Sequence, residues 1–299
     1  MTHVARLASR ALLAISGEEA RPFLQGLVSN DVGKVGESRA IYGALLTAQG
    51  KYLHDFFLAE RAGVLLLDCE QARRDDLKRR LTIYKLRAKA AIAAEDGLCV
   101  WALWGEGALA RLGFSGSEKA GHARPFAGGI AFVDPRLAAL GARALLPAGA
   151  ENDLASSGFA VCAEGEYDPW RLAHGVPDGS RDLEIEKSIL LESNFEELNG
   201  VDFDKGCYIG QELTARTKYR GLVKKRLFPV EIEGDAPAPG SEITLAGADI
   251  GTMRSAKGGR GLALLRLDAA LGGEILESAG ARLKPIKPEW LKLPAESDG

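Results

Sequence analysis

Cysteine and histidine are both scarce in this chain of 299 residues, which contains four of each. No two cysteines form a C-x-x-C pair, so the sequence does not predict a self-contained zinc or iron–sulfur cage. So few cysteines in a chain of this length also argue against a disulfide-based scaffold and indicate a reducing compartment. The cysteines are Cys69, Cys99, Cys162 and Cys207.

Long apolar runs and an excess of positive charge are also missing. No apolar run reaches the roughly 18–20 residues needed to cross a bilayer. The net charge of −3 gives the molecule no overall basic field for nucleic acid. With 46% apolar and 26% charged residues, the composition is that of a globular protein. Its length is sufficient for two or three domains, since domains usually have roughly 100–200 residues.

The N-terminal residues 1–17 contain two arginines and no acid, a composition also found in mitochondrial transit peptides. The apolar run at residues 11–15, closed by Ser16-Gly17, is more typical of a first strand. Further along, residues 40–46 and 52–58 flank the turn Gln49-Gly50, which predicts a β-hairpin.

Short strand-like pieces separated by Pro and Gly begin after residue 225 and predict a small all-β domain. These pieces are residues 228–232, 242–245, 249–253 and 261–267.

Residues 71–89 have a helical pattern and carry eight basic side chains against two aspartates. Leu77, Leu81 and Tyr84 recur at helical spacing, which predicts one buried side. The simplest interpretation of the basic side is a solvated helix face. An anionic ligand, a partner protein and RNA are the functional alternatives.

Residues 105–110 follow an apolar strand at 99–104 and match the dinucleotide-binding pattern G-x-G-x-x-A. A dinucleotide site would require an acid about 20 residues further on, and none is present there. Glu106 would also lie beside the bound phosphates. We therefore interpret this segment as a strand–turn–helix joint.

Residues 205–212, Lys-Gly-Cys-Tyr-Ile-Gly-Gln-Glu, place one thiol between two glycines. Glycine allows positive φ and close approach of another molecule. Lys205 could favour the thiolate of Cys207 by Coulomb attraction. Gln211 and Glu212 offer an amide and a carboxylate that could bind the edge of a heterocycle. From the residues alone, a buried structural cysteine in a tight turn is the alternative.

Six basic residues lie within the eleven positions 216–226, directly after this run, with no acid among them. Such charge would suit a ligand with several carboxylates. A solvated surface is the alternative.

The segments 205–217 and 225–230 resemble the YgfZ-type iron–sulfur assembly family, whose members are related to the glycine-cleavage aminomethyltransferase. The resemblance implies an α+β fold class with three parts around a central funnel that holds tetrahydrofolate. These parts are a discontinuous first lobe, an inserted ferredoxin-like lobe and a C-terminal β-barrel. The implied domains are a folate-binding bilobed region at 1–225, with the inserted lobe at roughly 45–125, and a barrel at 226–299. Other segments that fit the family are residues 23–32, 43–55, 84–87 and 168–177.

The resemblance also implies roles for single residues. Glu192 corresponds to a pterin-binding glutamate, and Asp55 to an aspartate near the reactive folate nitrogen. The aminomethyltransferase branch often has two acids at the second position, whereas this chain has only one after His54, and that branch lacks the cysteine motif. Both differences favour an assembly factor over a metabolic enzyme. The predicted cofactor-binding residues are Glu192, Asp55, Asn30, Arg171, Tyr208, Gln211, Glu212 and Arg216.

The resemblance therefore implies a tetrahydrofolate-binding factor for assembly or repair of 4Fe–4S proteins. Cys207 and Lys205 are its predicted catalytic residues, with Cys207 as a possible ligand of a cluster shared with a partner and no metal site of the chain's own. The expected partners are an A-type scaffold protein and 4Fe–4S client enzymes, with no membrane partner. The alternatives are a folate-dependent aminomethyl or methyl transferase and, ranked last, an RNA-binding module. The expected location is the cytoplasm of a bacterium, or the mitochondrial matrix if the chain is eukaryotic.

Overall fold

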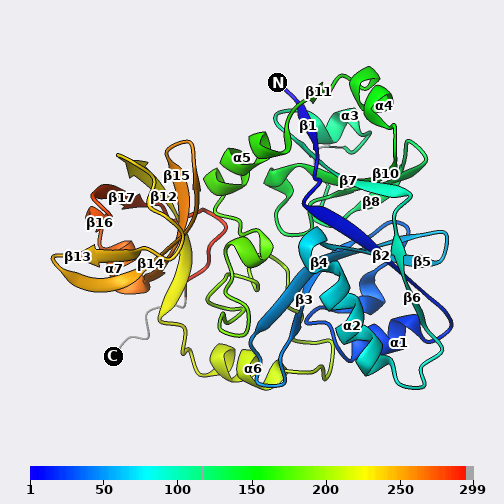
Figure 1. Ribbon diagram of the computed structural model, residues 1–299, viewed down its shortest axis with the longest axis horizontal. Coiled ribbons are helices and arrows are strands. Elements are labelled where there is room, and N and C mark those ends of the chain that lie inside the picture. Colours follow the sequence, from blue (N-terminus) through cyan, green and yellow to red (C-terminus); the bar gives the residue numbers. More distant parts are fainter. Residues whose placement is uncertain (116–117, 294–299) are drawn as a thin grey trace. The chain divides into compact units, whose positions relative to one another are not determined.

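The computed structural model describes residues 1–115 and 118–293 (Figure 1). By the density of its internal contacts, the chain divides into two compact units. Unit 1 consists of Met1–Leu46, Leu53–Tyr167 and Asn199–Ile209, and unit 2 of Thr47–Tyr52, Asp168–Leu198 and Gly210–Gly299. Each unit therefore collects segments that are far apart in the sequence.

A five-stranded sheet in the order β3-β4-β5-β2-β6 forms one layer of unit 1. β2 and β5 pair antiparallel, with Leu13 opposite Leu67. Leu77 and Leu81 of one helix and Leu24 of another belong to the same buried apolar cluster as Leu13 and Leu67. The bounds are β2 Arg10–Ser16, β3 Ile41–Leu46, β4 Tyr52–Arg61, β5 Val64–Glu70, β6 Ala91–Glu95, α1 Ala20–Gln25, η1 Val32–Lys34, η2 Gln71–Arg73 and α2 Arg74–Lys85.

The second layer of unit 1 is a six-stranded sheet in the order β11-β1-β7-β10-β9-β8. β7 pairs antiparallel with both β1 and β10, so this sheet lacks the parallel arrangement of a dinucleotide-binding unit at that point. The bounds are β1 His3–Arg6, β7 Leu98–Trp104, β8 Ala123–Phe126, β9 Gly129–Val133, β10 Ala142–Pro147, β11 Ala160–Val161, α3 Ala108–Arg111, α4 Glu151–Ser156, η3 Ala138–Leu140 and η4 Glu164–Glu166.

Buried charges connect the two sheets of unit 1. The Asp68 carboxylate on β5 accepts hydrogen bonds from Arg10 Nε at 2.7 Å and from Arg143 Nη2 on β10 at 2.6 Å. The guanidinium groups of Arg10, Arg143 and Arg136 all lie within 5.6 Å of the centre of the Phe57 ring. A buried ion pair contributes little net stability, but removing one partner leaves an uncompensated charge. This cluster therefore fixes how the sheets pack.

The C-terminal part of unit 2 is a closed barrel in the order β12-β15-β14-β13-β16-β17. Its β14–β15 hairpin turns through Gly258-Gly259, both with positive φ, as a two-residue hairpin loop requires. Phe228, Ile243 and Leu265 belong to its buried core. The bounds are β12 Lys225–Glu233, β13 Glu242–Leu245, β14 Ala248–Lys257, β15 Arg260–Arg266, α7 Leu267–Leu271, β16 Leu276–Ser278 and β17 Ala281–Pro285.

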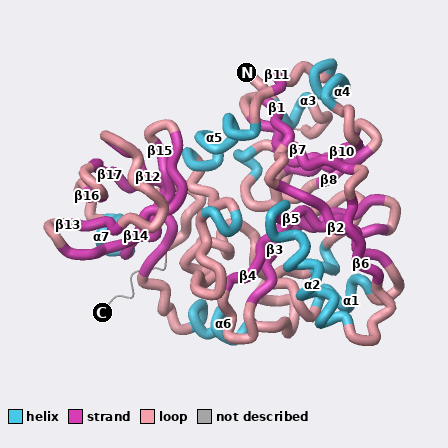
Figure 2. Tube along the Cα trace, in the orientation of Figure 1, coloured by secondary structure: helices cyan, strands magenta, loops and turns pink. Residues whose placement is uncertain are grey.

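Between the helices α5 (Tyr167–Ala173) and α6 (Gln211–Tyr219) the chain is mostly turns and loops, interrupted by η5 (Gly179–Arg181) (Figure 2). Buried side-chain hydrogen bonds hold this irregular backbone in place. Asn194 Nδ2, for example, donates to the Leu227 carbonyl oxygen at 2.8 Å. The candidate residue Glu192 lies in this stretch.

The structure confirms the main elements predicted from the sequence. Residues 11–15 form a strand, β3 and β4 are sheet neighbours around Gly50, and residues 105–110 form a strand–turn–helix joint. The basic helix is shorter than predicted, because it ends at Lys85 and Leu86 has a positive φ of 46°. The prediction that Tyr84 is buried was wrong, since its exposed fraction is 39%.

Candidate functional site

Cys207 lies on an exposed loop of unit 1. The loop is fixed at one end by the Ile209 amide, which donates to the Gly26 carbonyl oxygen at 3.1 Å. Gly206 has a φ of 89°, and a Cβ there would contact nothing within 4 Å, so glycine is required for its conformation rather than for space. Within the described part of the chain, the Cys207 thiol has no hydrogen-bond partner. It is therefore accessible from solvent.

The Lys205 ammonium points back into unit 1. It donates to the carbonyl oxygen of Gln25 at 2.7 Å and to that of Val28, and lies 4.9 Å from the centre of the Tyr208 ring. Burial lowers the pKa of Lys205 to about 8, although Asp31 and Asp202 act in the opposite direction. Lys205 thus anchors the cysteine loop to the carbonyl end of α1, a structural role that the sequence analysis did not anticipate.

Asp55 and Asn30 are both buried in unit 1. Tyr42 donates its hydroxyl to Asp55 Oδ2 at 2.8 Å, and burial followed by the negative charge of Asp55 raises the pKa of Tyr42 well above its usual value. Tyr42 therefore stays a hydrogen-bond donor that orients the carboxylate. Asn30 donates to the carbonyl oxygens of Tyr42 and Asn199, each at 2.7 Å, so its amide group is committed to the backbone.

His54, the neighbour of Asp55 on β4, faces helix α2. Its Nε2 lies 2.9 Å from Asp76 Oδ2. Burial, with a contribution from Arg73, lowers the pKa of His54 to about 4 despite this carboxylate. Neighbouring residues of a strand point to opposite faces, which separates the roles of His54 and Asp55.

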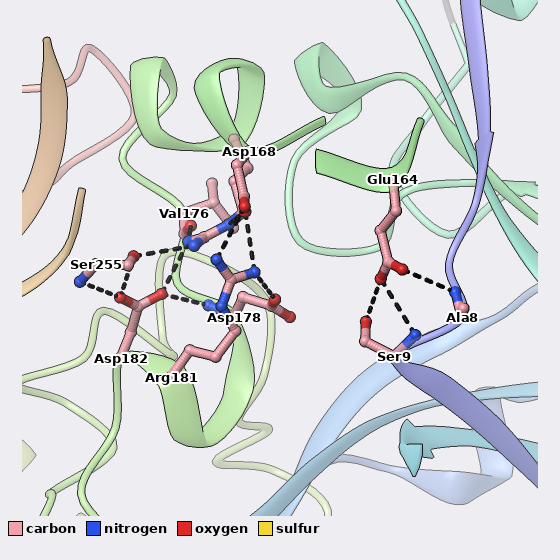
Figure 3. Close-up of polar contacts among 10 residues, drawn as sticks. Ala8, Ser9, Glu164, Asp168, Val176, Asp178, Arg181, Asp182 and Ser255 are labelled. Atoms are coloured by element: carbon pink, nitrogen blue, oxygen red, sulfur yellow. Dashed lines mark hydrogen bonds and ion pairs between the residues drawn. The ribbon is translucent and has the colours of Figure 1, made fainter. Parts of the chain in front are cut away.

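Arg171 is the centre of a polar cluster in unit 2, and its partners Asp168, Asp182 and Ser255 are labelled in Figure 3. Its guanidinium donates to Asp168 Oδ1 at 2.8 Å, to Asp182 Oδ2 at 2.8 Å and to Ser255 Oγ at 2.9 Å. It also donates to the Val176 carbonyl oxygen at 3.2 Å, and the residue is only 1% exposed. These contacts tie α5 and the following loop to the barrel strand β14, so the visible role of Arg171 is structural.

Glu192 in unit 2 presents the opposite situation. Its backbone carbonyl accepts from the Leu227 amide at 2.9 Å, which holds the residue in place. Its half-buried carboxyl has no hydrogen-bond partner among the residues that the structure describes. Burial raises the pKa of Glu192, opposed by the positive charges of Lys51 and Lys225. A positioned, partly desolvated carboxyl of this kind can accept hydrogen bonds from a ligand.

Lys51 was missed by the sequence analysis as a neighbour of Glu192. The one sequence signal for it was the glycine in Gln49-Gly50-Lys51. In the structure Gly50 has a φ of 82°, and a Cβ there would lie 2.6 Å from both the Gly210 carbonyl oxygen and the Leu213 side chain. The glycine therefore allows this turn to pack against the start of α6. That close approach places Lys51 in the electrostatic environment of Glu192.

The remaining predicted residues lie near the start of α6 or just before it. Glu212 and Arg216 form an exposed pair at 3.7 Å, which contributes little to stability. Gln211 is the first residue of the helix, whereas Tyr208 precedes it and is 8% exposed beneath Lys205. Two of the basic residues that follow are paired with acids, Lys218 with Glu196 and Arg226 with Glu197.

The basic helix α2 is less positive than its sequence indicates. Arg79 and Arg80 both pair with Asp76, and Arg74 pairs with Asp96 at 2.5 Å. Asp96 belongs to a later segment and was not counted as a counter-ion in the sequence analysis. These ion pairs favour the interpretation of a solvated helix face.

Neither a metal cage nor a membrane span is found in the described residues. Across residues 1–115 and 118–293, no three His, Cys, Asp or Glu side chains are grouped so as to hold a metal ion. Over the same residues, no helix has the length and apolar character needed to cross a bilayer.

Comparison with known proteins gives relatives for nearly the whole chain. The chain is 35% identical over 315 residues to the human protein named iron-sulfur cluster assembly factor IBA57, mitochondrial, covering 95% of this chain and 84% of the relative. Identity to the mouse protein of the same name is 34%, with 95% and 84% covered. The Aspergillus clavatus homologue is 31% identical, with 97% and 76% covered.

Two further comparisons concern the fold. Residues 224–293 match the family described as CAF17, C-terminal beta-barrel domain, which confirms the predicted barrel. The crystal structure of glycine cleavage system aminomethyltransferase T from Bartonella henselae superposes with a TM-score of 0.78, covering 97% of this chain and 86% of that chain. At 16% identity this likeness shows the fold alone. The predicted aminomethyltransferase-like fold class is therefore confirmed.

Proposed function

The chain belongs to the IBA57 family of iron–sulfur cluster assembly factors, within the YgfZ-type family, and from that premise we propose that it binds tetrahydrofolate and serves the assembly or repair of 4Fe–4S proteins. The observation that carries folate binding is the carboxyl of Glu192. It is half-buried, its pKa is raised by burial, and no described side chain or amide donates a hydrogen bond to it.

The fit between Glu192 and a pterin is chemical. The pterin ring presents adjacent N–H donors, and a carboxylate accepts two of them side by side. Such charge-assisted hydrogen bonds are about twice as strong as neutral ones. Lys51 and Lys225 supply positive potential around the carboxyl, which favours its ionised, accepting form. Tetrahydrofolate, when bound, would supply a carrier for one-carbon units.

Asp55, in unit 1, stays a prediction of the family resemblance. The Tyr42 hydroxyl fixes one oxygen of its carboxylate at 2.8 Å, which holds the group in one orientation. Arg171 and Asn30 support binding only indirectly in this proposal, because the structure commits their polar atoms to protein partners. They position the backbone rather than contact the ligand.

The exposed thiol of Cys207 is the group that we propose acts on the cluster or on a partner. An exposed thiol without an internal hydrogen bond can be reached by a cluster bound to another protein. A single thiol cannot hold a cluster by itself, so a shared site would take its other ligands from an A-type scaffold protein or a 4Fe–4S client. The chain acts in this proposal as an assembly factor.

Calorimetric titration with tetrahydrofolate tests the ligand proposal. We expect binding to the wild type and a loss of roughly tenfold to a hundredfold in affinity for Glu192→Gln, since a hydrogen bond to a charged group contributes about 1.5–3 kcal/mol. Glu231→Gln, at an exposed barrel position, is the matched control and should bind like the wild type. Equal affinity of the Glu192→Gln protein and the wild type would disprove the role of Glu192.

A cellular assay tests the thiol separately. Replacing Cys207 by Ser in a strain that lacks the endogenous protein should lower the activity of 4Fe–4S enzymes while leaving folate affinity unchanged. Full cluster-enzyme activity with the Ser variant would remove Cys207 from the mechanism without affecting the folate proposal.

A folate-dependent one-carbon transferase is the second candidate. Asp55 is the feature that favours it, because an oriented carboxylate could accept a proton near a reacting nitrogen. Incubation with an aminomethyl-lipoyl donor and tetrahydrofolate should then release methylene-tetrahydrofolate, and Asp55→Asn should abolish the product. No product from the wild type would exclude this activity for that donor.

A further inference from the structure

A second thiol of unit 1, Cys162, lies beside a histidine. Cys162 Sγ is 3.3 Å from His3 Nδ1 and 3.4 Å from the Ala160 carbonyl oxygen. The two side chains are 159 positions apart in the sequence, so only the fold brings them together. Of the four cysteines, Cys162 is the one with an imidazole within hydrogen-bond reach in the described residues.

The register of three neighbouring strands explains this juxtaposition. β1 pairs antiparallel with β7, with His3 opposite Trp104, and parallel with β11, with His3 opposite Ala160. Directly opposite residues of paired strands present their side chains on the same face. Cys162 lies two residues after Ala160, so it returns to that face, and its amide donates to the Val4 carbonyl oxygen at 2.8 Å.

The imidazole is also held in orientation. The His3 ring stacks on the Trp104 indole with centroids 5.5 Å apart and an interplanar angle of 25°. Trp104 is itself packed by Tyr167 in an edge-on contact at 5.3 Å. Stacking disfavours the rotation of the histidine ring that would carry Nδ1 away from the thiol. A nucleophile, a base within hydrogen-bond reach and a third group that orients the base are the parts of an activated thiol.

Access to the thiol comes from its place at the edge of the sheet. β11 is the outermost strand next to β1 and has only two residues. Cys162 is half-exposed, and the preceding Val161 is 53% exposed. A small reagent can therefore reach Sγ, and the His3 imidazole lies 3.3 Å from it.

We propose that Cys162 and His3 form a reactive thiol–imidazole pair, a modification site that exchanges with small disulfides. A neutral imidazole protonated at Nε2 accepts the thiol proton at Nδ1. The Cys162 thiolate attacks one sulfur of a disulfide R–S–S–R, the Cys162–S–S–R bond forms, and the R–S⁻ group leaves and takes up the proton from the imidazolium. The electrons balance because the incoming disulfide is the oxidant. This site is independent of the proposed folate binding and of Cys207.

Peptide-resolved mass spectrometry of the folded full chain tests the proposal, with a small aromatic disulfide as the probe. Cys99 is the internal control, because it is also half-exposed but has no imidazole within reach in the described structure. We expect Cys162 to react at least about tenfold faster than Cys99, as a positioned base raises the reactive fraction of a thiol. Equal rates at the two cysteines in the wild type would overturn the proposal without any variant.

His3→Gln supplies the second arm. It should slow modification of Cys162 by about tenfold while the rates at Cys99 and Cys207 stay unchanged, since only Cys162 has lost its base. Unchanged rates at the two other thiols also report that the fold is intact. An unchanged rate at Cys162 in a folded His3→Gln protein would show that the imidazole does not activate the thiol.

Discussion

Arg171, on helix α5, and Glu192, in the irregular segment that follows it, lie twenty-one positions apart in unit 2, yet their surroundings differ completely. Arg171 is 1% exposed and donates to four different protein groups. Glu192 is half-buried and has a raised pKa and no hydrogen-bond partner for its carboxyl among the described residues. Both were predicted as ligand-binding residues from the sequence. The difference teaches that a polar group satisfied by the protein builds the fold, whereas one held in place but left without a partner is available to a ligand.

Removing the Arg171 guanidinium should have the largest effect. Arg171→Ala leaves Asp182 buried without its counter-ion, and we expect it to lower the free energy of unfolding by roughly 3–5 kcal/mol. Urea unfolding followed by circular dichroism measures this loss. Arg181→Ala is the control, because Arg181 pairs with Asp168 and Asp178 but is 48% exposed, so about 1 kcal/mol or less is expected. Equal losses in the two variants would contradict the structural role of Arg171.

His54 extends the comparison to a buried group of unit 1. Its pKa is lowered from 6.5 to about 4. Between pH 4 and 6.5 the unfolded chain therefore binds a proton at His54 more readily than the folded protein does. The free energy of unfolding is therefore highest above pH 6.5 and falls as the pH drops towards 4. The total loss is about 3 kcal/mol, at 1.36 kcal/mol per pKa unit.

Urea unfolding at pH 7, 6, 5 and 4 measures this slope, and His54→Gln should flatten it by the same amount. The carboxylates of the protein titrate in both proteins, so the difference between the two curves isolates the histidine. Parallel curves for the wild type and the variant would show that His54 does not cause this pH dependence of stability.

The fold was predictable where its signals are local. The Gln49-Gly50 turn and the short Pro- and Gly-separated strands of the barrel specify their own conformations within a few residues. The length of the helix after residue 71 was less accessible, because it depends on the positive φ of Leu86, a residue whose type gives no such signal.

The partners of the candidate site residues were not predictable in the same way. Arg171 finds Ser255 84 positions away, and Lys205 finds Gln25 180 positions away. No local pattern records such pairs, so the sequence identified Lys205 as a polar residue beside the thiol but not as an anchor of α1. Glu192 was named through the family resemblance. What the structure adds is that its carboxyl has no internal hydrogen bond in the described part of the chain.

Neutralising Glu192 should have the smallest effect on stability, and one of opposite sign. Burial raises its pKa above the usual 4.5, so the folded protein binds this proton more tightly than the unfolded chain does. The ionised carboxyl therefore costs stability above its folded pKa, and the cost disappears as the pH falls below 4.5.

We expect Glu192→Gln to be slightly more stable than the wild type at pH 7 and equal to it at pH 4, measured by thermal unfolding without ligand. A variant less stable than the wild type at pH 7 would mean that the carboxyl has an internal partner, and the contrast with Arg171 would no longer hold. A gain in stability together with lost folate affinity is the combination expected of a residue kept for a ligand rather than for the fold.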